Sequence, residues 1–134
     1  MLPFKVALRS GESPYRQVVY AATRAILSGE LPQGEAFPSV RELSQALKIN
    51  PNTAQKVIAE LVRAGLLEVQ PGIGTIVAAG RRSSAAERWA LLSRDVEQLI
   101  VEARRLGLEA DDVIEAIEEQ WARLFGERAA VRTR

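Results

Sequence analysis

The chain has 134 residues, of which 47% are hydrophobic and 26% are charged, a composition typical of an ordinary globular protein. It contains no Cys and no His, which excludes disulfides, thiolate nucleophiles, imidazole bases and Cys/His metal sites. No stretch approaches the roughly 20 apolar residues that cross a bilayer, and residues 1–5 lack the apolar run of a signal peptide. We therefore expect a cytoplasmic protein without a metal, a cofactor or a membrane contact.

The net charge of +1 does not by itself indicate a protein that binds nucleic acid. Residues 1–80 carry eight Lys or Arg and six Asp or Glu, whereas the remaining residues carry ten and eleven. The first part is thus slightly basic and the second slightly acidic. This bias has the sign expected for DNA binding by the first part, but it is too small to decide the function.

The first 35 residues predict an extended arm, one helix and a turn. Phe4, Val6 and Leu8 alternate with smaller or charged residues over 4–9, which indicates a short strand or an extended arm. Ser13 followed by Pro14 is a typical helix start, because the hydroxyl caps the first turn and proline suits the first helical position. The helix ends at Gly29, and residues 31–35 form a turn. The apolar stripe of this helix consists of Tyr15, Val19, Ala22 and Ile26.

Two further helices are predicted on either side of a tight turn. Ser39 and Glu42 form a capping box, since each can satisfy a free backbone amide of the other. The helix that they open ends at Lys48, and Asn50-Pro51 starts the next helix almost at once. Gly65 ends that third helix. Its apolar stripe consists of Ala54, Val57, Ile58, Leu61 and Val62.

Two β-prone runs, residues 66–70 and 75–78, follow the third helix and are joined by Pro71-Gly-Ile-Gly74. This pattern predicts a hairpin. Three short helices followed by a two-stranded wing are the element order of a winged helix-turn-helix. In that fold the tight turn crosses the second and third helices steeply, so that the third lies in the major groove of DNA while the second crosses the backbone.

The third helix offers four polar side chains near its N-terminus, where bases are read. They are Asn52, Thr53, Gln55 and Lys56. Asn and Gln can form two hydrogen bonds with adenine, and Lys can reach guanine or phosphate. A polar helical stripe is most often only a solvated face, and for these residues alone that interpretation would be favoured. Their position between a tight turn and a glycine-bearing hairpin favours base contacts instead.

Four motifs between Ser13 and Val77 carry a resemblance to a known family. They are Pro14-Tyr15-Arg-Gln17-Val18, Ile26-Leu-Ser-Gly29-Glu-Leu31-Pro, Phe37-Pro38-Ser39-Val-Arg41-Glu42-Leu43 and Gly65-Leu66-Leu67-Glu-Val-Gln-Pro-Gly72-Ile-Gly74-Thr75. Together they resemble the DNA-binding domain of the GntR family of bacterial regulators. Residues 49–53 resemble the YtrA-type branch, whose C-terminal part is short and helical. Pro51 departs from the family, because many members carry there an Arg that contacts DNA, and Phe37 stands where Leu is usual.

The resemblance implies roles for further residues. Arg41, at the start of the second helix, would contact phosphate or a guanine. The alternative is a surface Arg paired with Glu42 or Gln45. Gly72, Gly74 and Thr75 stand where the wing tip meets the minor groove or the backbone, although the glycines also suit a hairpin turn that needs positive φ. The complete set of predicted DNA contacts is Ser39, Arg41, Asn50, Asn52, Thr53, Gln55, Lys56, Gly72, Gly74 and Thr75.

Beyond Gly80 the sequence predicts two helices. Ser84 and Glu87 form a second capping box, and the helix that they open ends at Leu106-Gly107. Its apolar residues recur at alternating steps of four and three, which is a heptad pattern about three repeats long. They are Ala85, Trp89, Leu92, Val96, Leu99, Ala103 and Leu106. A last helix over 111–126 has Val113, Ile117, Trp121 and Leu124 on one face.

These two helices cannot bury both apolar faces by pairing only with each other. We therefore predict a homodimer, because symmetric dimers are the commonest oligomers and readers of this class bind paired half-sites. The predicted dimer contacts are Trp89, Leu92, Val96, Leu99, Ala103, Leu106, Ile117 and Trp121. The alternative is that the seam packs back onto the winged domain within one chain. Two helices leave little room for a buried effector pocket, whereas a pocket at the dimer interface stays open, so the sequence leaves the small-molecule effector unassigned.

Two other classes of protein fit less well. An enzyme would need the carboxylates at 111–112 and 118–119, but neighbours in a helix point about 100° apart, and these lie opposite the apolar face. Residues 72–74 lack the Lys-Ser/Thr of a phosphate loop. A winged-helix module that binds a protein, without sequence-specific DNA binding, would expose apolar residues on the third helix rather than Asn52 and Gln55.

The sequence thus predicts a mostly α-helical fold with a small β-hairpin. A winged helix-turn-helix DNA-binding domain occupies residues 1–80, a two-helix dimerisation region residues 81–127, and a flexible basic tail residues 128–134. The predicted function is that of a homodimeric repressor. It would bind an inverted-repeat operator in double-stranded DNA through the helix that starts near Asn50-Pro51 and through the wing around Gly72–Gly74.

Overall fold

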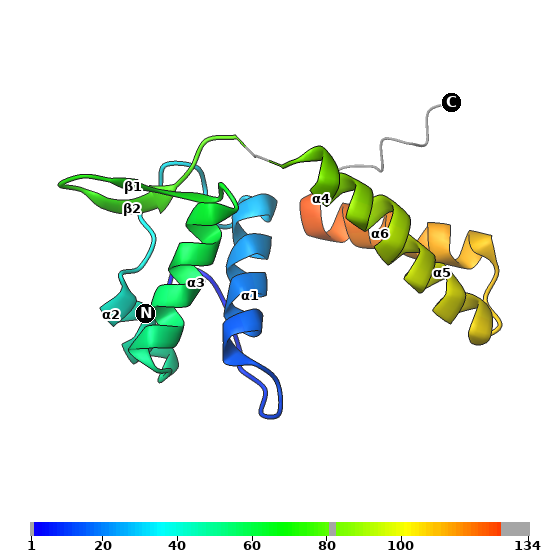
Figure 1. Ribbon diagram of the computed structural model, residues 1–134, viewed down its shortest axis with the longest axis horizontal. Coiled ribbons are helices and arrows are strands. Elements are labelled where there is room, and N and C mark those ends of the chain that lie inside the picture. Colours follow the sequence, from blue (N-terminus) through cyan, green and yellow to red (C-terminus); the bar gives the residue numbers. More distant parts are fainter. Residues whose placement is uncertain (1, 81–82, 127–134) are drawn as a thin grey trace. The chain divides into compact units, whose positions relative to one another are not determined.

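The computed structural model describes residues 2–80 and 83–126 (Figure 1). It divides the chain into two compact units, Met1–Arg82 and Ser83–Arg134. Arg81, Arg82 and the predicted basic tail over 128–134 lie outside the described residues.

The N-terminal unit has three helices followed by a hairpin. Its elements are α1 (Pro14–Ser28), α2 (Val40–Leu47), α3 (Pro51–Arg63), β1 (Leu67–Gln70) and β2 (Gly74–Val77). Helix α3 packs against α1, α2 and β1, so it is the central element of this unit. The predicted winged helix-turn-helix order is confirmed, and the hairpin strands differ from the predicted ones by one residue.

The helices begin where the capping residues predict. The hydroxyl of Ser13 accepts a hydrogen bond from the N–H of Arg16, and Ser39 and Glu42 form the predicted reciprocal box. Helix α2 ends at Lys48, whose φ of 56° makes it the one residue other than glycine with positive φ in the described chain. This left-handed residue turns the backbone sharply enough for α3 to begin almost immediately.

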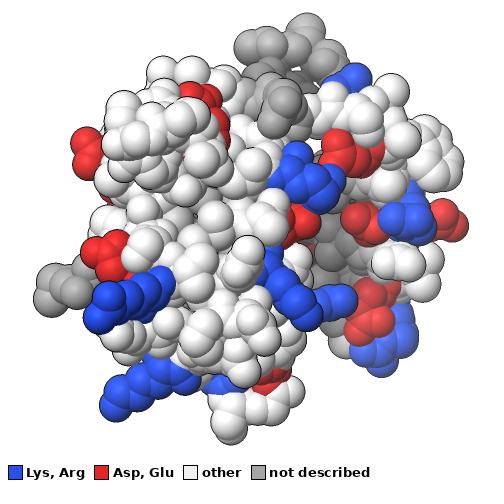
Figure 2. Space-filling model, turned by 60° about the vertical axis from the view of Figure 1, so that its left-hand side comes forward, with Lys and Arg blue, Asp and Glu red and all other residues white. Residues whose placement is uncertain are grey.

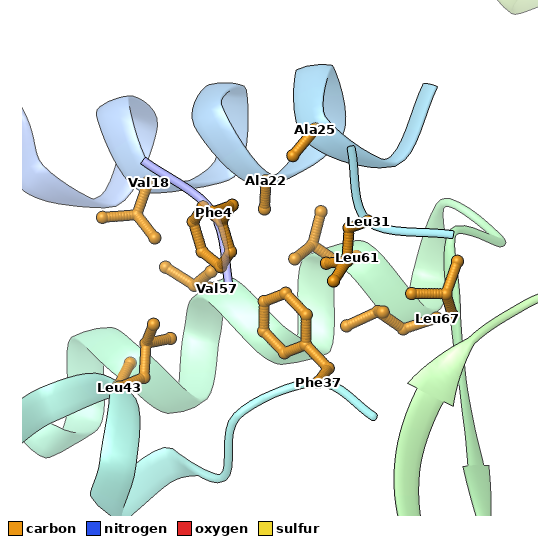
Figure 3. Packing of buried hydrophobic residues seen from close by; sticks show 12 residues of the cluster. Phe4, Val18, Ala22, Ala25, Leu31, Phe37, Leu43, Val57, Leu61 and Leu67 are labelled. Carbon is orange, nitrogen blue, oxygen red and sulfur yellow. The ribbon is translucent and has the colours of Figure 1, made fainter. Parts of the chain in front are cut away.

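The apolar core lies between the three helices and the base of the hairpin (Figure 3). It consists of Phe4, Val18, Ala22, Ala25, Leu31, Phe37, Leu43, Ala54, Val57, Leu61, Leu67 and Val77. On α1 the buried face centres on Val18, Ala22 and Ala25, whereas Tyr15 and Val19 of the predicted stripe are only half-buried. The small Ala side chains let α3 approach α1 closely, and the larger residues flank that contact.

The N-terminal arm packs on this core without forming a strand. Phe4 is buried, and its ring stacks on that of Phe37 with centroids 5.6 Å apart and an angle of 17° between the planes. Val6 and Leu8 are half-buried against the same core, and the residues between them are exposed. The alternating pattern therefore marks an extended arm with one face inward, which is the second of the two predicted possibilities.

One side chain of α1 holds the end of the arm. The amide of Gln17 accepts a hydrogen bond from the N–H of Arg9 at 2.8 Å. Its Nε2 donates to the carbonyl oxygens of Arg9 at 3.0 Å and Glu12 at 3.1 Å. Gln17 thus satisfies backbone groups that an unpaired arm would otherwise leave to water.

A third extended segment, which the sequence did not indicate, pairs with the hairpin. Strand β2 pairs antiparallel with β1 on one side and with residues 34–37 on the other. The N–H of Phe37 donates to the carbonyl oxygen of Thr75 at 2.8 Å, and an isolated antiparallel bridge joins Ala36 to Ile76. The loop before α2 therefore fixes the base of the hairpin.

The C-terminal unit is a helical hairpin. The helical segments α4 (Ala85–Trp89), η1 (Ala90–Asp95) and α5 (Val96–Arg105) follow one another without a break, and α6 (Ala110–Phe125) returns after the stop at Leu106-Gly107. The predicted box of Ser84 and Glu87 is formed. The last helix starts one residue before the predicted Asp111, because the N–H of Glu109 is capped by the carboxylate of Asp112 at 2.8 Å.

The segment η1 is a π-helix, which the heptad pattern did not predict. A π-turn accommodates about one residue more than an α-turn, which corresponds to a rotation of about 100° around the axis. The regular α-helical register that the heptad pattern assumes is therefore interrupted over Ala90–Asp95. The predicted dimer contact at Trp89, on the N-terminal side of this segment, stays a prediction.

Candidate nucleic-acid interface

The N-terminus of α3 is closed by its own capping residue. Oδ1 of Asn50 accepts the N–H of Asn52 at 2.7 Å, and Pro51 at the first helical position has no N–H to satisfy. The side-chain oxygen of Asn50 is therefore occupied within the helix, and its amide N–H groups are what it can offer to a ligand.

The polar residues predicted to read bases lie together on the uncovered face of α3. Asn52, Gln55 and Lys56 are exposed, and Thr53 is half-buried. Because residues three and four apart share a helix face, the side chains at 52, 55 and 56 are neighbours. The opposite face is buried in the core through Ala54, Val57 and Leu61. The helix thus presents hydrogen-bonding groups outward from a fixed scaffold.

An ion pair on the last turns of α3 neutralises the one acidic residue of this helix. Arg63 contacts the carboxylate of Glu60 through Nη2 at 2.6 Å and through Nε at 2.9 Å. The hydrogen bond from Arg63 lowers the pKa of Glu60. Lys56, one turn earlier, forms no ion pair within residues 2–80. Its charge is therefore available to an anionic partner.

The start of α2 supplies two further predicted contacts. The hydroxyl of Ser39 accepts the N–H of Glu42 at 3.1 Å, and the N–H of Ser39 donates to Oε1 of Glu42 at 2.9 Å. These hydrogen bonds lower the pKa of Glu42, and the one from the Ser39 backbone has the larger effect. Arg41, which lies between Ser39 and Glu42 in the sequence, is exposed and forms no ion pair in the described part of its unit. The alternative pairing with Glu42 is therefore not formed.

The glycines of the wing have the geometry that a tight hairpin needs. Gly72 and Gly74 have φ angles of 80° and 128°, a region that favours glycine. Both are exposed, and Thr75 beside them is half-buried with its carbonyl oxygen bonded to the N–H of Phe37. The turn alone explains the glycines, so their predicted contact with DNA stays a prediction.

The face of the molecule shown in Figure 2 carries no single large basic patch. On the face shown in Figure 2, Lys and Arg side chains stand in separate groups between wide uncharged areas. This agrees with the net charge of +1. A surface of this kind gives little sequence-independent attraction to phosphate, so specific affinity has to come from contacts with the bases.

One residue near this face was assigned to the core by the sequence pattern. Tyr15 of α1 is half-buried and lines an open groove of about 560 Å³ beside the polar face of α3. The other lining residues are Thr53, Lys56, Ala59, Glu60 and Arg63. Tyr15 packs against the core as the helical spacing predicts, but that spacing alone does not show that it also borders this groove.

The C-terminal unit carries an apolar groove between α5 and α6. The groove has a volume of about 420 Å³. Its apolar lining consists of Val96, Leu99, Ile100, Ala103, Leu108, Ala110, Val113, Ile114 and Ile117. Of the predicted dimer contacts, Val96, Leu99, Ala103 and Ile117 lie together here. Trp89, Leu92, Leu106 and Trp121 do not line the groove and are exposed.

Comparison with known proteins shows relatives over most of the chain. Residues 14–77 match the family of bacterial regulatory proteins called the gntR family. The chain is also 32% identical over 112 residues to the HTH-type transcriptional repressor YtrA of Bacillus subtilis (strain 168), covering 83% of this chain and 86% of that relative. The chain belongs to the GntR family. It is therefore a DNA-binding transcription regulator and not an enzyme, and its resemblance to the YtrA-type branch is confirmed.

Solved structures agree on the fold of this GntR member. A transcriptional antiterminator from Listeria monocytogenes EGD-e superposes with a TM-score of 0.77 at 24% identity, over 94% of this chain and 95% of the other. A GntR family transcriptional regulator from Listeria monocytogenes gives a TM-score of 0.63 at 25% identity, over 84% and 98%. The fold class predicted from the sequence is confirmed.

Within 2–80 and 83–126, no group of three or more acidic side chains is placed to hold a metal ion. No helix in that part of the chain is long and apolar enough to cross a membrane.

Proposed function

We propose that this GntR member is a homodimeric repressor that binds an inverted-repeat operator, with one N-terminal unit on each half-site. The proposed role as a repressor is supported by the similarity to YtrA of Bacillus subtilis, which covers both units of the chain. Because its partner is DNA, the proposal also places the protein in the cytoplasm. No effector ligand is part of it.

The exposed polar face of α3 is the observation that best supports the proposed sequence-specific binding to DNA. In the proposed complex α3 lies in the major groove, with Asn52 and Gln55 bonded to base edges and Lys56 to guanine or phosphate. Arg41 is exposed at the start of α2, the helix that crosses the backbone in this arrangement. The remaining proposed contacts are Ser39, Asn50, Thr53, Gly72, Gly74 and Thr75.

The dimer is supported by the lack of a core in the C-terminal unit. Among residues 83–126, Ala103 is the only buried one. Leu99 and Ile117 each remain 47% exposed in a groove that is almost entirely apolar. A second copy packed on this groove would form a four-helix bundle and remove both side chains from water. Residues 81–127 would then be the dimerisation region.

Selection of bound duplexes from a random library, with purified protein at stated salt, tests the proposal. We expect an inverted repeat whose half-sites are centred about 34 to 36 Å apart, or a multiple of this distance. Sedimentation of the free protein should give a dimer. Recovery of no motif would contradict sequence-specific binding and favour the alternative of a winged module that binds another protein. A monomer in sedimentation would favour a seam that packs within one chain.

A further inference from the structure

A groove of about 510 Å³ lies between the N-terminal arm and helix α1. One wall comes from residues 5–9 of the arm and the other from residues 17–25 of α1. The walls run antiparallel, because Arg9 is hydrogen-bonded to Gln17 and the chain then turns back into α1 at Pro14. Each wall is about 12–13 Å long, so the groove has room for about four residues of extended chain.

The arm presents an unpaired backbone edge to this groove. The N–H and the C=O of Arg9 both bond to the side chain of Gln17, so both point toward α1. In an extended chain, alternate residues direct these groups to the same edge, which adds Ala7 and Lys5. Within residues 2–80, the backbone groups of Ala7 and Lys5 form no hydrogen bond. Such an edge can take up an extended peptide as an additional strand.

The rim of the groove is basic and includes an exposed aromatic ring. Lys5 and Arg24 are exposed and form no ion pair within residues 2–80. Arg9 already pairs with a neighbouring carboxylate, and the acidic residue of the lining, Glu30, comes after the end of α1. Tyr20, one turn before Arg24, is 62% exposed. A peptide with carboxylates near the two free cations and an apolar side chain against the ring would complement this rim.

The groove opens away from the side of the unit that is proposed to hold DNA. On α1, Tyr15 borders the polar face of α3. At about 100° per residue, the groove residues Gln17, Tyr20 and Arg24 lie about 140–200° from Tyr15 around the helix axis. A duplex bound by α3 therefore leaves the groove open.

We propose that this groove binds an acidic segment of a partner protein, which adds to the arm as an extended strand beside Lys5 and Arg24. The partner can bind while the regulator is on its operator, since the two surfaces face different ways. This goes beyond the proposed function and depends on it only for the position of the DNA.

Selection from a random peptide library displayed on phage, against the full chain free of DNA, tests the proposal. We expect a consensus rich in Asp and Glu that includes an apolar residue. A synthetic peptide of that consensus should bind the free and the operator-bound protein with similar affinity at about 0.15 M salt, where distant charges are screened. No consensus, or one without acidic residues, would overturn the proposal. So would displacement of the peptide by the operator, because it would place the peptide on α3. The selection needs no operator, so its outcome is separate from that of the proposed function.

Two further measurements separate the charges from the backbone. The double variant Lys5→Gln/Arg24→Gln should bind the peptide about ten-fold more weakly, because two ion pairs are lost. The control Arg16→Gln changes an exposed Arg of α1 that does not line the groove and should bind as the wild type does. Circular dichroism verifies that both variants are folded. N-methylation along the peptide should abolish binding at alternate positions, those whose N–H faces the arm. Unchanged affinity of the double variant, or tolerance of N-methylation at every position, would overturn the proposal.

Discussion

Replacing Phe4 with Ala measures how firmly the N-terminal arm is bound to the DNA-binding unit. Phe4 is 4% exposed and stacks on Phe37. Removing a buried Phe costs about 3–5 kcal/mol when the cavity stays open. Because an arm without strand pairing can shift to fill part of the space, we expect the lower end of that range, about 3 kcal/mol. In urea this lowers the unfolding midpoint by about 1–3 M.

The two units offer separate probes for this experiment. Both tryptophans, Trp89 and Trp121, belong to the C-terminal unit, so their fluorescence reports that unit, whereas far-UV circular dichroism reports the helices of both. The Phe4→Ala midpoint should fall in circular dichroism and change less in fluorescence. Lys5→Ala, which alters an exposed residue of the same arm, is the control. Equal midpoints for Phe4→Ala and Lys5→Ala would refute the docking of the arm.

The stacking of the two rings can be measured by itself in a double-mutant cycle. Phe37→Leu introduces the residue that is usual in the family, and Phe4→Leu keeps the arm apolar. Paired aromatic rings contribute about 0.5–1.5 kcal/mol beyond the area that they bury. The double variant should therefore lose less stability than the sum of the two single losses. Strict additivity would show that the rings contribute burial only.

Three further predictions concern the interface, the dimer and the second helix. Gln55→Ala should weaken binding to the selected operator by about 1–3 kcal/mol, because a base contact is lost, and should leave binding to random DNA unchanged in mobility-shift titrations. Equal weakening on both DNAs would contradict a base contact of Gln55. Leu99→Asp should sediment as a monomer, since it places a charge in the apolar groove. The control Gln98→Asp, which changes an exposed residue next to it, should remain a dimer. A dimeric Leu99→Asp protein would show that the groove is not the interface. Hydrogen bonds from Ser39 lower the pKa of Glu42 in the folded state, so the carboxylate stabilises the protein above its ordinary pKa of 4.5, and this contribution is lost as the pH falls through the lowered value. Glu42→Gln should therefore have a lower urea midpoint than the wild type at neutral pH and the same midpoint in acid, and a difference that persists in acid would contradict the linkage.

The helix starts and the hairpin could be predicted because their signals lie within a few neighbouring residues. A capping hydroxyl before Pro14, the Ser39 and Glu42 box and the Asn50-Pro51 pair each determine a helix N-terminus locally. Likewise Pro71-Gly-Ile-Gly74 specifies a tight turn whatever surrounds it. These local signals were sufficient to establish the element order of the DNA-binding unit.

The features that the sequence did not indicate depend on residues far apart in the chain or on backbone register. The pairing of Ala36 with Ile76 joins a segment that resembles a plain turn to a strand 40 residues later. The π-turn at 90–95 changes hydrogen-bond partners without changing the apolar spacing, so the heptad pattern gave no sign of it. At the candidate site, periodicity placed Tyr15 in the apolar stripe but could not show that this half-buried residue also lines the groove beside α3.

The stacked pair of Phe4 and Phe37 bears on how this regulator can be divided. The family pattern begins at residue 14, yet Phe4 lies ten residues before it and belongs to the core. Gln17 lies inside this pattern, but its side-chain amide is hydrogen-bonded to the backbone of the arm, which lies outside it. A fragment trimmed to residues 14–77 would uncover Phe37 and leave the amide of Gln17 without its partners. The cooperative folding unit is therefore longer than residues 14–77, which the family pattern covers, and an isolated DNA-binding fragment has to include the arm.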